Sequence, residues 1–146
     1  MKKVGFYLLV LSFLACKKTP SVNCDNRTND VTISEQIIVG KWEWASQQTC
    51  GRAGCGSIST PTTQGFTKQM VFKADGNVYI YKNNALEKEG HWRIAPEKEF
   101  TNATGPNLLV LETTDKKPFD LSVFHICSDS LYLNVGYDGT DKWAKQ

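Results

Sequence analysis

The residues of this chain with the greatest chemical potential are its cysteines. Beyond the N-terminal leader and Cys16, four cysteines remain, at Cys24, Cys50, Cys55 and Cys127. An even number in an exported chain favours disulfides over free thiols, although four cysteines permit three connectivities. The segment from Cys50 to Cys55 is short and contains two glycines, so it can close on itself. We therefore expect disulfides Cys50–Cys55 and Cys24–Cys127.

A zinc site is the alternative use of these cysteines, with His91 and His125 completing it. Four residues separate Cys50 from Cys55, whereas zinc-binding pairs are commonly separated by two, so we do not predict zinc. His125 shares its parity with apolar residues of the strand-like run 119–127, which predicts an inward side chain. Such a histidine is either a ligand contact or a hydrogen-bonded core residue. His91 has the outward parity of its own strand, and we expect it to be solvated.

The sequence contains no local signature of catalysis. It has no Gly-x-Ser-x-Gly, no phosphate-binding Walker loop and no helix with paired histidines. Four glutamates that could attract a cation lie close in sequence: Glu87, Glu89, Glu97 and Glu99. Lys88 and Lys98 lie between them, which is typical of a solvated surface. We predict neither an enzyme nor a cofactor nor a metal site.

Large aromatic residues supply the second candidate site. In the stretch 38–44, Trp42 and Trp44 share one face of an expected strand, while Lys41 and Glu43 share the other. Phe72 and Trp92 fall on the same predicted interior. Together with His125, these four rings are the candidate ligand contacts. Large rings either fill an interior or line a cavity, and filling is the default expectation.

A leader precedes these elements. Lys2 and Lys3 are followed by an apolar run from residue 4 to 14, which is too short to span a membrane as a helix. The sequence Phe13-Leu14-Ala15-Cys16 resembles the lipobox of bacterial lipoprotein signal peptides. This resemblance implies that residues 1–15 are a cleaved signal and that Cys16 carries fatty-acyl chains, such as palmitate, that hold the protein on a membrane.

The region after Cys16 indicates where such a protein would reside. Residues 16–33 are polar and predict a flexible tether. Lys17 and Lys18 lack the aspartate associated with retention at an inner membrane, so we expect the outer membrane. Without the leader the chain has 15 basic and 15 acidic side chains. This balance gives no basic stripe for a nucleic acid, and we exclude that partner class.

The remaining sequence reads as one β-rich domain. Ser34 is the expected N-cap of a short helical turn over 34–37, and residues 50–65 form a long loop that is either functional or a lid stapled by its own disulfide. Eight strand-like segments with hairpin turns predict an antiparallel barrel or sandwich. These segments are 38–44, 66–73, 78–82, 86–94, 108–113, 119–127, 131–135 and 140–144.

Short motifs in a fixed order carry a family resemblance. They are Gly40-Lys41-Trp42-Glu43-Trp44, Met70-Val71-Phe72-Lys73-Ala74-Asp75-Gly76, Glu89-Gly90-His91-Trp92-Arg93-Ile94 and Ser130-Leu131-Tyr132-Leu133. Over residues 34–146 the chain is similar to small lipocalin-like (calycin) lipoproteins of the bacterial envelope. The resemblance implies an eight-stranded up-and-down barrel whose interior can hold a small apolar ligand. The two loop cysteines depart from the family pattern.

Two functions are therefore expected. The first is a lipid-anchored binding module of the cell envelope, with a small apolar ligand in its barrel. The second is a barrel with a filled core that acts as an interaction or inhibitor module, with its surface loop 50–65 engaging an envelope protein.

Overall fold

The computed structural model describes residues 30–101, 106–135 and 139–146. The predicted signal 1–15, Cys16 and the tether up to residue 29 lie outside the described residues. The elements in chain order are α1 (Val31–Ile38), β1 (Gly40–Gly51), β2 (Gly54–Cys55), α2 (Pro61–Gln64), β3 (Lys68–Phe72), β4 (Asn77–Lys82), β5 (Ala85–Pro96), the 3-10 helix η1 (Glu97–Glu99), β6 (Asn107–Glu112), β7 (Pro118–Cys127), β8 (Ser130–Val135) and β9 (Gly139–Lys145).

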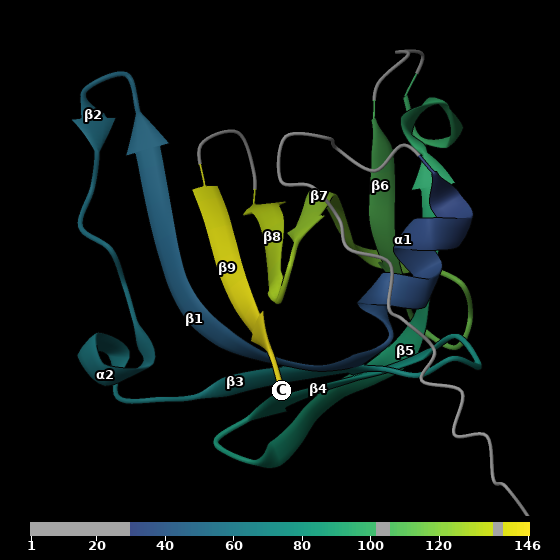
Figure 1. The fold of residues 1–146 in the computed structure, drawn as a ribbon, viewed down its shortest axis with the longest axis horizontal. Coiled ribbons are helices and arrows are strands. Elements are labelled where there is room, and N and C mark those ends of the chain that lie inside the picture. Colours follow the sequence, from purple (N-terminus) through teal and green to yellow (C-terminus); the bar gives the residue numbers. More distant parts are fainter. Residues whose placement is uncertain (1–29, 102–105, 136–138) are drawn as a thin grey trace, which may run out of the picture.

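Within the described part of the chain, eight strands form a closed antiparallel barrel (Figure 1). Their order is β1-β3-β4-β5-β6-β7-β8-β9, and β1 also pairs with β9, which closes the sheet. Short turns join neighbouring strands from β3 to β8, except for the longer connection that contains η1. The predicted all-β, eight-stranded up-and-down barrel is confirmed, and from residue 66 onward each strand boundary lies within two residues of its prediction.

The first barrel strand, β1, begins at a glycine and contains a bulge. Gly40 has φ of +138°, a conformation that side chains with a Cβ rarely adopt, and it lets the chain turn from α1 into β1. Trp42 and Trp44 then point inward and are buried, as predicted. The pairing with β9 shifts between Trp44 and Ser46, so Ala45 is an extra residue. Beyond it β1 continues to Gly51, well past the predicted end.

The helix before β1 begins earlier than the sequence analysis predicted. Asp30, rather than Ser34, is the N-cap of α1, and its Oδ1 accepts a hydrogen bond from Ile33 N at 3.2 Å. Residues 31–33, assigned to the tether, are therefore helical. Ser34 is fully buried within the helix, since α1 packs its Ser34 and Ile37 side against the barrel. The carboxylate of Asp30 precedes Val31, so it caps the helix four residues before Ser34 could do so.

The interior next to α1 is filled. Ile38, Trp42, Phe72 and Val78 have almost no exposed surface, and Phe72 meets Trp92 edge to face with 5.7 Å between ring centroids. The Trp42 indole donates to Ile38 O at 2.7 Å, which ties the end of α1 to this core. The default expectation that the large rings fill the barrel is therefore correct for this half of the interior.

The long loop after β1 contains regular structure of its own. Cys50 and Cys55 are paired residues of the β1–β2 hairpin and form a disulfide, as predicted. The loop ends in α2, capped by Thr60, and in Figure 1 β2 and α2 lie on the opposite side of the view from α1. Cys127 is also disulfide-bonded. Its predicted partner, Cys24, lies outside the described residues, so that pairing stays a prediction.

Candidate ligand-binding site

The structure separates the five predicted site residues. Trp42 and Phe72 lie in the filled half of the barrel, and Trp92 lies between that core and the molecular surface. Trp44 lies further along β1, toward the barrel end away from α1, which we call the distal end. His125 does not join them. Most of these rings therefore belong to the hydrophobic core, and the five side chains do not line a single pocket.

The inward orientation predicted for His125 is wrong. The buried residues of β7 are Ser122, Phe124 and Ile126, so His125 lies on the outer face. There it stacks on Tyr132 of β8, with 4.4 Å between ring centroids and 4° between planes. The cause is a bulge: Leu111 pairs with Asp120 but the next residue of β6 pairs with Pro118. Counting alternation from Phe119 across the bulge reverses every face after it.

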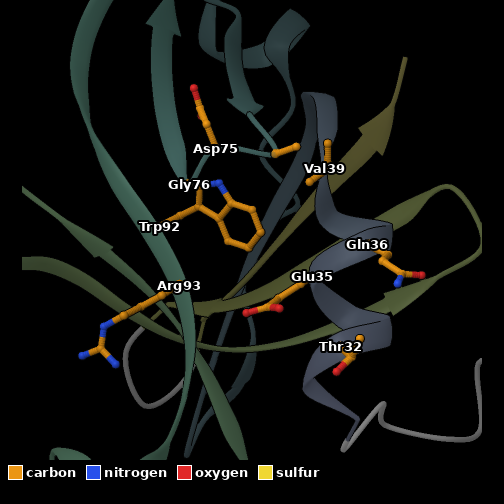
Figure 2. A pocket seen from close by; sticks show the side chains of 9 residues that line it. Thr32, Glu35, Gln36, Val39, Asp75, Gly76, Trp92 and Arg93 are labelled. Atoms are coloured by element: carbon orange, nitrogen blue, oxygen red, sulfur yellow. The ribbon is translucent and has the colours of Figure 1, made fainter.

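A groove of about 480 Å³ lies between α1, the β3–β4 turn and β5 (Figure 2). The Trp92 ring forms its floor, Glu35 reaches into it from α1, and Arg93 points away from the helix. Two of its polar groups have partners within the protein. Trp92 Nε1 donates to Lys73 O at 2.9 Å, and Asp75 accepts from Asn77 N at 3.0 Å. These two groups therefore need no ligand to complete their hydrogen bonds.

Arg93 beside this groove is a structural ion-pair residue. Its Nη1 lies 2.8 Å from Glu99 Oε2 and its Nε lies 3.0 Å from Glu112 Oε1. The hydrogen bond that Arg93 donates to Glu99, followed by the one it donates to Glu112, raises the pKa of Arg93 above its usual value. These contacts connect η1 to the outer face of β5 and β6, and Arg93 has little capacity left for a ligand.

A second hollow lies inside the barrel at the distal end. This distal cavity has a volume of about 150 Å³ and mixes apolar and charged walls. Its lining residues are Lys68, Met70, Ile80, Glu87, Leu111, Asp120, Ser122, Leu133, Asp141 and Trp143. They come from seven strands, β3 to β9, so only the closed barrel brings them together. Glu87 and Asp120 are exposed at its edge.

Sheet register explains why these side chains converge. Trp143 pairs with Trp44 on one side and with Leu131 on the other, all of them inward and buried. Asp141, two residues before Trp143 on β9, has the same inward parity and pairs with Leu133. The barrel thus places a carboxylate and an indole on one strand, facing the same space.

Two polar atoms of the distal cavity lack a partner. Among the described residues, Asp141 Oδ1 and Trp143 Nε1 are the buried side-chain oxygen and nitrogen without a hydrogen bond. Trp143 is only 4% exposed. Leaving a buried donor or acceptor unpaired costs about 1–3 kcal/mol, so such groups in native proteins usually have a partner from solvent or a ligand.

Electrostatics single out the same carboxylate. Burial raises the pKa of Asp141, although the charge of Lys68 and a hydrogen bond from Trp44 oppose this shift, and the charge of Asp120 adds to it. The Lys68 ammonium lies 5.6 Å from the Trp44 ring centroid and 5.4 Å from that of Phe66, and the two rings stack. A cation at the distal end is therefore already held by aromatic faces.

Asp120 faces Asp141 across the cavity and is positioned by its own strand. The Ser122 hydroxyl donates to Asp120 Oδ1 at 3.0 Å. Ser122 is buried at an inward position of β7, opposite Leu109 of β6.

Comparisons with protein-family models, curated proteins and solved structures found no match. The site must therefore be interpreted from its own chemistry. Among the described residues, no helix has the length and apolar composition needed to cross a membrane.

Sequence reasoning missed the residues that define the distal cavity. Asp141 and Trp143 have the same parity in the predicted strand 140–144, and that pattern was the available signal. An acidic residue on the face of a buried indole is unusual for a barrel core. Lys68, Asp120 and Ser122 carried no comparable signal, because their inward orientation depends on the register of β3 and β7.

Proposed function

We propose that the protein is a lipid-anchored binding module of a bacterial cell envelope, and that it holds a small ligand in the distal cavity. The observation that carries the proposal is an unfilled space inside a closed barrel, lined by one unpaired donor and one unpaired acceptor. The lipobox-like sequence ending at Cys16 supports the anchoring part. No catalytic role is included.

A ligand screen with a blocked cavity tests the binding proposal. Native mass spectrometry and thermal-shift measurements would cover fatty acids, haem-like compounds, cell-wall fragments and small polar molecules. In the variant Ser122→Met, the added side chain occupies the distal cavity, and every hit should disappear. Val123→Met is the matched control, because Val123 is the next residue and packs on the outer face against the cluster of Ala95, Leu108 and Val110. Silence across the panel would count against a binding role.

Anchoring is tested separately. The substitution Cys16→Ser removes the only thiol of the lipobox-like sequence, so we expect loss of lipid labelling and release of the protein from membranes. Labelling with a fatty-acid analogue followed by membrane fractionation measures both. The substitution Cys55→Ser, in the loop hairpin, should leave both unchanged. Membrane retention of the Cys16→Ser variant would exclude acyl anchoring at this residue.

The interaction module remains the second candidate function. One observation favours it: the large apolar side chain of Ile58 is 55% exposed in the loop between β2 and α2, where a partner protein can contact it. If that loop engages an envelope protein, Ile58→Asp should abolish cross-linking to it in intact cells, whereas Ser122→Met should not. The opposite pattern would favour the cavity.

A further inference from the structure

The two unpaired atoms of the distal cavity define what a ligand must offer. Trp143 Nε1 can only donate a hydrogen bond, whereas the ionised carboxylate of Asp141 can only accept one. They lie two residues apart on β9 and face the same space. A purely apolar ligand would leave both unpaired and add the cost of their lasting desolvation. The ligand therefore needs a donor and an acceptor.

Charge decides the kind of donor. Three carboxylates line the distal cavity, from Glu87, Asp120 and Asp141, against the single ammonium of Lys68. The Lys68 ammonium is directed to the rings of Trp44 and Phe66, and no ion pair with Asp141 is formed within 4.0 Å. A cationic donor is stabilised by the excess of negative charge, whereas an anion is repelled by it.

The volume of the distal cavity and its apolar walls limit the size and the remaining chemistry of the ligand. A volume of about 150 Å³ corresponds to about five waters at the liquid volume of about 30 Å³ each. Met70, Leu111 and Leu133 form an apolar wall, and all three are buried. The ligand is thus compact, with an aliphatic part between its polar groups.

Resting on the binding function proposed above, we infer that the distal cavity binds a small organic amine that also carries a hydroxyl or carbonyl oxygen. The ammonium lies against Asp141, with Asp120 and Glu87 at the edge attracting it. The oxygen accepts the hydrogen bond of Trp143 Nε1. The aliphatic part contacts Met70 and Leu111. The pairing of both buried groups distinguishes this ligand class from apolar molecules.

Three probes of similar size separate the requirements: aminobutanol, butylamine and butanediol. Isothermal titration calorimetry should show aminobutanol binding about tenfold more tightly than either of the others, since butylamine has no acceptor for Trp143 Nε1 and butanediol has no positive charge to pair with Asp141. Asp141→Asn should weaken aminobutanol about tenfold or more. Asp129→Asn is the charge-matched control, because Asp129 lies in the β7–β8 turn at the α1 end. The affinity of the Asp129→Asn variant for aminobutanol should equal that of the unmodified protein.

Trp143 gives a readout that does not depend on a variant folding. In the ¹⁵N-labelled protein, the indole N–H resonance of Trp143 should shift on addition of aminobutanol and should move much less with butylamine, which has no acceptor for it. Trp143→Phe should weaken aminobutanol about fivefold while leaving butylamine unchanged. Trp92→Phe, at the groove beside α1, is the aromatic control and should leave both affinities unchanged.

The outcomes distinguish this inference from the function on which it rests. If butanol or a fatty acid binds in the distal cavity and aminobutanol does not, the amine inference is overturned but the binding function stands. The same holds if a divalent cation binds there and is lost with Asp141→Asn. If none of these probes binds and the Trp143 resonance never moves, water occupies the cavity and both proposals fail.

Discussion

At the scale of single residues, the ionised side chain of Asp141 lowers the stability of the folded protein. Its pKa is raised by burial, so the folded state holds the proton more tightly than the unfolded chain does. Below the ordinary carboxyl pKa both states are protonated and no penalty exists. As the pH rises through the raised folded value, the unfolded state is favoured, so at neutral pH the ionised group lowers stability.

The substitution Asp141→Asn should therefore stabilise the protein in the absence of ligand. At neutral pH we expect the melting temperature to rise by about 2–3 °C, a small gain because Asp141 is only partly buried and solvent screens its charge. Thermal unfolding followed by circular dichroism over a range of pH measures it. The gain should vanish as the pH falls below the ordinary carboxyl value. An unchanged or lower melting temperature at neutral pH would contradict the penalty.

Gly90 is a second residue at which geometry leaves little freedom. A Cβ on Gly90 would lie 2.1 Å from Glu112 O and 3.2 Å from a Phe119 ring carbon, so β5 and β6 would have to separate. We expect Gly90→Ala to destabilise the barrel by about 1–3 kcal/mol, measured by urea denaturation. Gly51→Ala is the control, because nothing lies within 4 Å of that Cβ and the change should be small.

At the scale of elements, the β1–β2 hairpin is an appendage of the barrel. Cys55 is exposed, and β2 pairs only with the end of β1. The double substitution Cys50→Ser with Cys55→Ser should cost at most about 2 kcal/mol, the chain-entropy estimate for so short a loop. Calorimetry should find the barrel folded and the distal cavity still competent to bind. Loss of cooperative unfolding would show that the hairpin supports the barrel.

Elements were largely predictable from the sequence, and the errors have physical causes. Alternation and turn residues located the strands, and Trp42, Trp44, Phe72 and Trp92 were correctly assigned to the interior. Alternation cannot reveal a bulge, because one extra residue reverses the faces that follow it. That is why His125 was misplaced. The start of α1 was missed because Asp30 and Ser34 are both acceptable caps, and only packing decides between them.

At the scale of the whole molecule, the interior of the barrel has two unlike halves. The half next to α1 is filled by large rings, and the distal half keeps its charged residues around a small space. The sequence could not predict this division. Apart from Asp141 on the same strand face as Trp143, the lining residues of the distal cavity are ordinary by themselves, and their convergence follows from the closure of the sheet.

Closure of the barrel also constrains how the chain reaches its fold. Trp44 pairs with Trp143, so the contact that completes the sheet joins positions about a hundred residues apart. The β1 strand must wait, with an unpaired edge, until the last strand has been synthesised and delivered. A chain of this design cannot finish folding before its last strand is available. The edge of the sheet is therefore protected, and the distal cavity is formed, only when the C-terminal strand pairs with β1.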